Sequence, residues 1–167
     1  MKPPRLIAVD PSYTATGVSL FEDNVLKKVY LLKPDKKIEN RLWEIAIRFS
    51  AILELFKPEV MAIESQYLAI QSSSVIKVIE TKGLLEGLFY SYAIRNEIPP
   101  RIISIGPVTA KKAVGVVGRM KRKESKAKVK EAVCKLYPAI AEQSQDVMDS
   151  VAIGLAGLRE YLSTPVK

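Results

Sequence analysis

The chain has 167 residues, 48% of them hydrophobic and 26% charged, with a formal net charge of +8. This composition excludes a disordered chain and predicts one globular domain over residues 1–167 with a single core. The lone Cys134 excludes an internal disulfide, and the lack of histidine excludes a cysteine–histidine zinc site. No apolar run approaches the roughly 20 residues of a membrane span, so we expect a cytoplasmic protein with no membrane contact and, given its basic charge, a polyanionic partner.

The first half of the chain predicts a three-stranded meander followed by a helix. Residues 5–10 form an apolar run that ends at Asp10, and a second strand is expected over 16–22. Asp23-Asn24 is typical of a hairpin turn into a third strand, over 25–33. Apolar residues at i, i+3 and i+4 spacing then predict a helix over 38–56.

The second half alternates strands and helices. The run 59–64 is apolar on both faces, as in a central parallel strand. A long helix over 73–96 is apolar over an arc wide enough for both the sheet and a partner. A short strand at 101–105 follows, and then come helices at 107–114, 125–137 and 145–161, with a basic loop at 115–124. This order predicts an α/β fold with a five-stranded mixed sheet, a meander followed by parallel strands, and helices on both faces.

Four carboxylates stand where these elements begin or end. Asp10 and Glu64 each close a buried strand, and Asp146 and Asp149 lie three residues apart at the start of the last helix. A carboxylate there costs free energy unless it is compensated. Clustered hard oxygen ligands favour Mg²⁺, or Mn²⁺ in its place, and four of them can hold two ions roughly 4 Å apart. In a basic chain this indicates metal-assisted cleavage of a phosphodiester.

Each acid also has a plainer interpretation. Asp10 precedes Pro11 and can be a turn residue, whereas Asp146 and Asp149 can be an N-cap and a first-turn acid. Glu64 is harder to explain in this way, because neither a helix nor a turn gives it a structural role.

A basic segment follows the short helix. Residues 119–130 hold seven cations against one acid, Glu124. Such a run can neutralise several phosphates without reading bases, although it can also be a solvated loop. Ser125 is a candidate N-cap, which would turn a helix N-terminus towards phosphate. The cations are Arg119, Lys121, Arg122, Lys123, Lys126, Lys128 and Lys130.

Three motifs together resemble those of the RuvC-type Holliday junction resolvases, which belong to the ribonuclease H-like nuclease superfamily. They are Ala8-Val9-Asp10-Pro11 with Thr16-Gly17, Ala62-Ile63-Glu64, and the run 146–153 with its D-x-x-D spacing. The resemblance spans about residues 5–157. Members usually carry glycine after the Asp-Pro pair, where this chain has Ser12.

The resemblance implies a ribonuclease H-like fold and a homodimer that nicks opposed strands of a four-way DNA junction with Mg²⁺. The implied metal ligands and catalytic acids are Asp10, Glu64, Asp146 and Asp149. Lys126 would act beside them, Tyr67 would insert among bases near the junction centre, and either Lys111 or Lys112 would lie near the site. The further expected DNA contacts come from the basic segment and are Arg119, Lys121, Arg122, Lys123, Lys126 and Lys128.

Two other functions remain open from the residues alone. The same acids fit a broader branched-DNA nuclease or one acting on RNA–DNA hybrids. An inactive nuclease fold that only binds nucleic acid is a third possibility, although all four acids are present. No residue pattern indicates a branch-migration helicase as a further partner.

Overall fold

A computed structural model describes residues 3–35, 40–65 and 73–163. Five strands form one sheet in the order β3-β2-β1-β4-β5. Strands β1 (Leu6–Asp10), β2 (Thr16–Glu22) and β3 (Val25–Leu32) form an antiparallel meander. Strand β4 (Val60–Glu64) runs parallel to β1, and β5 (Arg101–Ile105) parallel to β4. The predicted mixed sheet is therefore confirmed.

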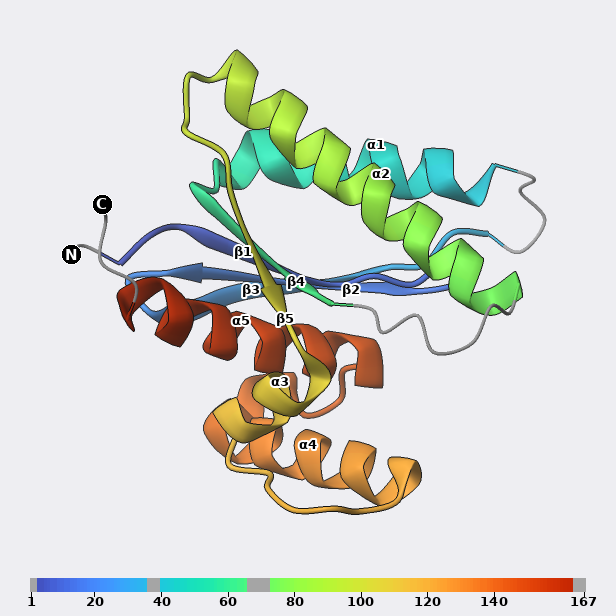
Figure 1. Cartoon of the computed structure of the whole chain (residues 1–167), viewed down its shortest axis with the longest axis vertical. Helices are drawn as coiled ribbons and strands as arrows, with labels where there is room; N and C mark the ends of the chain where they lie inside the picture. Colours follow the sequence, from blue (N-terminus) through green and yellow to red (C-terminus); the bar gives the residue numbers. More distant parts are fainter. Residues whose placement is uncertain (1–2, 36–39, 66–72, 164–167) are drawn as a thin grey trace.

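Helices cover both faces of the sheet (Figure 1). Helices α1 (Arg41–Phe56) and α2 (Ser73–Arg95) lie side by side on one face, and α5 (Gln145–Ser163) crosses the other. Helices α3 (Pro107–Ala113) and α4 (Arg122–Leu136) pack outside α5, and a short 3₁₀ turn, Pro138–Ile140, links α4 to α5. None of these helices, within the residues described, has the length and apolarity needed to cross a membrane.

The central strands are buried on both faces, which explains their unbroken apolar sequence. In β1, Leu6 and Ala8 face the core under α5, whereas Ile7 and Val9 face the core under α1 and α2. Strand β4 alternates in the same way. Strand β3 forms the sheet edge and is only partly buried. Its hairpin turn has φ of 52° at Asp23 and 63° at Asn24, the left-handed conformation predicted from the pair.

Helix α5 lies unusually close to the sheet because glycines remove side chains at the contacts. A Cβ on Gly154 would stand 2.2 Å from the Phe21 ring, and one on Gly157 would stand 2.6 Å from the Cβ of Ala62. The buried Ser19 hydroxyl donates a hydrogen bond of 2.9 Å to the Ser150 carbonyl. These contacts fix α5 in one position on β2 and β4.

The predicted start of the basic helix was wrong. Helix α4 begins at Arg122 rather than at 125, so Ser125 lies within the helix and is not its N-cap. The Ser125 amide donates to the Lys121 carbonyl at 2.9 Å. Ser125, Val129 and Val133 form one buried stripe at i, i+4 spacing, so packing extends the helix through residues that look like a loop. The other helix and strand ends differ from prediction by a few residues, and residues 38–39 lie outside the described part.

Candidate active site

The parallel pairing of β1 with β4 brings the first two acids together. Val9 is in register with Ile63, so Asp10 and Glu64 emerge side by side at the same edge of the sheet. Both follow four buried residues and are themselves only partly exposed. The strand-end position recognised in the sequence therefore places two carboxylates at the carboxyl edge, where ligands bind in open α/β sheets.

The start of α5 supplies the other two acids. Gly17, which pairs with Asp10 across the sheet, admits the helix: a Cβ there would stand 1.9 Å from the carbonyl oxygen of Asp146. The Ser144 hydroxyl accepts a hydrogen bond of 3.4 Å from the amide of Val147 and so caps the first turn. Asp146 and Asp149 are consequently held against the edge that carries Asp10.

All four acids line one cleft of about 410 Å³. One wall comes from the turn after β1 and from α2, through Ser12 and Val78. The facing wall comes from α3 and α4 and is basic, with Lys111, Arg122 and Lys126. The cleft is thus acidic at its floor and cationic on one wall.

The acids repel one another. Burial raises the pKa of Asp10 well above its ordinary value, and the charges of Glu64, Asp149 and Asp146 raise it further, against a lowering by Lys126. Burial also raises the pKa of Asp149, while Gln145 and Lys126 oppose that shift. The Gln145 amide donates to the Asp149 carboxylate at 2.8 Å, and the Lys126 ammonium lies 3.9 Å from it.

These acids fit a divalent cation in donor type and charge, because carboxylate oxygens are the ligands that hard cations prefer and their mutual repulsion is what a cation would relieve. Among the described residues, no three potential ligand side chains lie close enough together to hold one ion in this conformation. Asp149 is held by Gln145 and Lys126 instead. A carboxylate that binds an ion can keep such a hydrogen bond, so Asp149 can join the donor set while Gln145 orients it.

The predicted cations divide into two groups. Lys111, Arg122 and Lys126 line the cleft, whereas the neighbouring Lys112 is exposed outside it. Lys128 forms an ion pair of 3.1 Å with Glu124 and lines a second hollow behind α4. Three more predicted DNA contacts are exposed and do not line the cleft: Arg119, Lys121 and Lys123. The predicted Tyr67 lies outside the described residues.

Sequence reasoning did not foresee the roles of three residues that shape the site, although Ser12 and Gly17 were noted in the first motif. Gln145 holds Asp149, and its position one helical turn before that acid was the available signal. The Ser12 hydroxyl lies 3.4 Å from the amides of Thr14 and Ala15 and orders the turn after Asp10. The close approach that requires Gly17 left no local signal, because its partner is far away in the sequence.

This sheet order, with acids at the ends of β1 and β4 and at the start of α5, defines a ribonuclease H-like nuclease fold. The family model described as "Crossover junction endodeoxyribonuclease RuvC" matches residues 6–157, and the chain belongs to that family. Membership implies a nuclease that depends on a divalent metal, which agrees with the donor set of the cleft.

Individual relatives agree with this assignment. The chain is 26% identical over 163 residues to the crossover junction endodeoxyribonuclease RuvC of Prochlorococcus marinus strain MED4, covering 93% of this chain and 97% of the relative. Among solved structures it resembles T. thermophilus RuvC in complex with Holliday junction substrate, with a TM-score of 0.71, 21% identity, and coverage of 95% and 96% of the two chains. It also resembles fowlpox virus resolvase with substrate junction DNA, at a TM-score of 0.58 and 16% identity, over 95% of this chain and 99% of the other.

Proposed function

We propose that this chain is a structure-selective endodeoxyribonuclease that resolves four-way (Holliday) DNA junctions by paired, metal-dependent hydrolysis of phosphodiesters, acting as a single domain over residues 1–167. The observation that carries the proposal is the convergence of Asp10, Glu64, Asp146 and Asp149 in one cleft with a basic wall. Family membership supports the reaction class, and the junction-bound relatives support the substrate.

The acids and cations of the cleft have complementary roles in this proposal. We expect the cleft to hold two Mg²⁺ ions, or Mn²⁺ in their place, which would supply activation of the attacking water and stabilisation of the leaving oxygen. The four carboxylates hold the cation charge, with Asp10 in the middle of the repulsive cluster. Lys126 and Arg122 face the same space and place positive charge where the scissile phosphate must enter. Lys111, on the same wall, contacts the phosphate backbone of the DNA strand and so orients the strand.

A homodimer completes the proposal, because paired nicks need two sites. The outer face of α2 supports a homodimer because it carries four exposed apolar side chains. Two of these are Ile76, which is 51% exposed, and Ile94, which is 68% exposed. Gly83 and Gly87 lie between them, and a Cβ on either would meet nothing within 4 Å. A second helix can approach such a face closely, which suits a two-fold interface. The other two exposed side chains are Ile79 and Tyr90.

The test is cleavage of a labelled immobile four-way junction, a linear duplex and an RNA–DNA hybrid, with Mg²⁺ and with EDTA. We expect symmetric paired nicks in the junction alone and only with Mg²⁺. The Asp146→Asn variant should lose cleavage by a factor of about 100 or more while still binding the junction, since a ligand is lost but the basic wall is kept.

The outcomes separate the alternatives. Cleavage of the hybrid in preference to the junction would keep the acidic site and move the substrate elsewhere in the superfamily. Junction binding without any cleavage would make the chain a binder. Full cleavage by Asp146→Asn would contradict the assignment of the acids.

A further inference from the structure

We propose that Tyr13, Arg41 and Lys77, the aromatic–cation layer, form a second phosphate-binding surface on the wall of the cleft opposite α4. This inference rests on the proposed function. The layer would bind the sugar–phosphate backbone of the DNA strand at the point where that strand leaves the acidic floor of the cleft. The basic wall of α3 and α4 holds the same strand on the other side.

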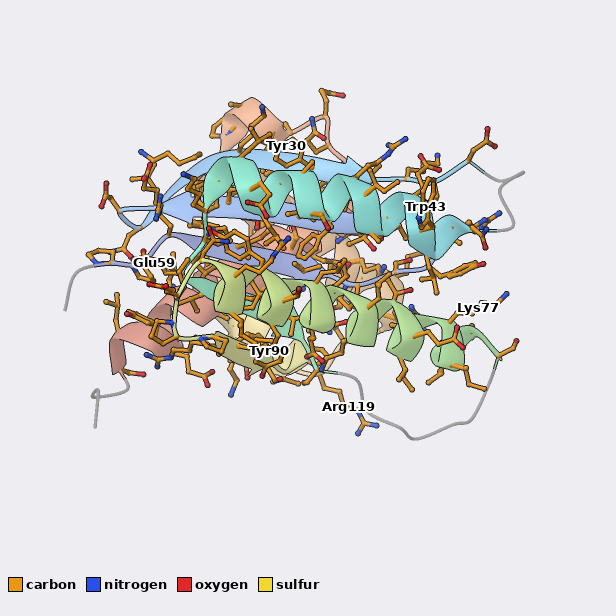
Figure 2. All side chains as sticks on the ribbon, turned by 90° about the horizontal axis from the view of Figure 1, so that it is seen from above. Tyr30, Trp43, Glu59, Lys77, Tyr90 and Arg119 are labelled. Atoms are coloured by element: carbon orange, nitrogen blue, oxygen red, sulfur yellow. The ribbon has the colours of Figure 1, made fainter. Side chains whose placement is uncertain are left out.

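The layer lies at the rim of the active site. Tyr13 belongs to the turn between β1 and β2, three residues after Asp10. Its neighbour Ser12 lines the cleft, as does Val78, the neighbour of Lys77 on α2. Figure 2 shows Lys77 at the end of the helical layer where α1 and α2 both begin, the end that also carries Trp43. Two members of the layer are therefore sequence neighbours of residues that line the cleft.

Tyr13 fixes the positions of two cations. The Lys77 ammonium lies 5.1 Å from the centroid of the Tyr13 ring, and the Arg41 guanidinium lies 5.5 Å from it. Both are within the distance at which a ring attracts a cation. The layer draws on three separate elements, the β1–β2 turn, α1 and α2, and it brings two positive charges to one aromatic side chain.

The turn that carries Tyr13 is braced from within. The Thr16 hydroxyl donates to the Ser12 carbonyl at 2.8 Å and accepts from the Ser12 amide at 3.2 Å. Thr16 is completely buried, so the turn is tied to the sheet beside Asp10. A ring held in this way keeps a constant distance from the acids, as a positioning surface requires.

Lys77 carries a charge that no acid in the described part of the chain pairs with. Among the residues that the structure describes, Lys77 has no ion pair, although it is exposed on a helix where Lys82 pairs with Glu86 at 3.6 Å. A cation held on an aromatic ring and still open to solvent is suited to phosphate. The contact would be independent of base sequence, so its ligand is the backbone of a DNA strand.

The cations of a second wall matter most before metal ions bind. In that state the floor of the cleft carries four acids without a bound cation, and these repel a phosphate strand wherever basic side chains do not offset them. Lys111, Arg122 and Lys126 offset them only on the α3 and α4 side. Lys77 and Arg41 supply the corresponding charge beyond Ser12, so a strand leaving the acids meets cations again instead of a neutral surface.

The experiment compares Lys77→Ala with Lys28→Ala. Lys28 is a matched control, because its ammonium also lies 5.1 Å from a tyrosine ring, that of Tyr30 on the edge strand β3. Binding of a labelled four-way junction is measured by fluorescence anisotropy in EDTA over a series of salt concentrations. Single-turnover cleavage with Mg²⁺ is measured on the same proteins.

We expect Lys77→Ala to weaken junction binding several-fold and to lower the slope of log affinity against log salt by about 1, the value for one lost phosphate contact. Lys77→Arg should keep the slope, and Lys28→Ala should match the wild type. Thermal unfolding of each variant checks that the fold is intact.

An unchanged slope and affinity for Lys77→Ala, in a wild-type protein that nicks the junction, would overturn this inference and leave the proposed function standing. A wild-type protein that fails to nick any junction would overturn the proposed function first. A loss of binding in Lys77→Ala that Lys77→Arg does not restore would mean that the layer acts by bracing the turn, and this too would overturn the inference.

Discussion

At the scale of single residues, Lys126 links the acidic floor of the cleft to its basic wall. Its ammonium is 3.9 Å from Asp149 and lowers the pKa of both Asp149 and Asp10. Two opposing effects therefore set the ionisation of the acids, since burial and mutual repulsion favour the protonated forms while Lys126 favours the charged forms that a cation requires.

Replacing Lys126 with alanine should shift the pH dependence of cleavage. The pKa values of Asp10 and Asp149 are already raised, and removal of the lysine charge raises them further. Carboxylates bind Mg²⁺ in the ionised form, so activity should be lost at a higher pH as the solution is acidified. A profile of single-turnover rate against pH at fixed, subsaturating Mg²⁺ measures this.

Lys128→Ala is the comparison for that experiment, because Lys128 lies on the same helix but pairs with Glu124. Its acid limb should coincide with that of the wild type. If the acid limb of the Lys126→Ala rate profile also coincided with that of the wild type, Lys126 would not control the ionisation of Asp10 and Asp149.

At the scale of elements, the docking of α5 on β2 decides whether the site exists. Gly17 leaves room for the backbone of Asp146, and the Ser19 hydroxyl bonds to the carbonyl of Ser150 one turn later. Two of the four acids thus depend on a helix-to-strand contact that has no side chain at its tightest point.

Gly17→Ala should displace the start of α5. The added methyl would stand 1.9 Å from a backbone oxygen, which cannot rotate away as a side chain can. We expect a loss of about 1 to 3 kcal/mol in the free energy of unfolding, typical of overpacking, and a larger proportional loss of cleavage. Urea unfolding and single-turnover rates measure the two effects.

The exposed Lys27, on the edge strand β3, provides a control through Lys27→Ala, which should change both quantities little. Unaltered stability and rate in Gly17→Ala would show that α5 can shift without disturbing the acids.

The elements also show what sequence reasoning can reach. Asp10 and Glu64 were predictable because a charge that ends a buried strand conflicts with its surroundings, and that conflict is local. The start of α4 was not predictable, because Lys121 makes no side-chain capping bond. The helix is held instead by the buried stripe of Ser125, Val129 and Val133, which packs on α5. The stacking of Lys77 on Tyr13 joins residues far apart in the chain, so no window of sequence contains it.

At the scale of the whole molecule, the described residues include two exposed apolar faces that are candidates for the interface of the proposed dimer. One is the outer face of α2, and the other lies on α1, where Trp43 is 67% and Leu55 81% exposed. The α2 face differs in having Gly83 and Gly87 at its middle, which lets a partner helix approach closely.

Ile94→Glu should therefore convert a dimer into monomers, because a buried unpaired carboxylate opposes association. Sedimentation velocity at micromolar concentration measures this, and junction cleavage should change from paired to unpaired nicks. Leu55→Glu places the same charge on α1 and should leave the dimer intact. The reverse pattern would move the interface to α1, and a wild-type monomer would remove the dimer from the proposal.

The order of the acids along the chain has a further consequence for the cell that makes this protein. Asp10 lies on the first strand, whereas Asp146 and Asp149 lie on the last helix. During synthesis, a ribosome must release α5 before the cleft can close around a phosphate, and a chain cut short anywhere before that helix lacks half of its acids. A partial chain that lacks α5 would thus have no complete acidic cluster with which to hold a cation.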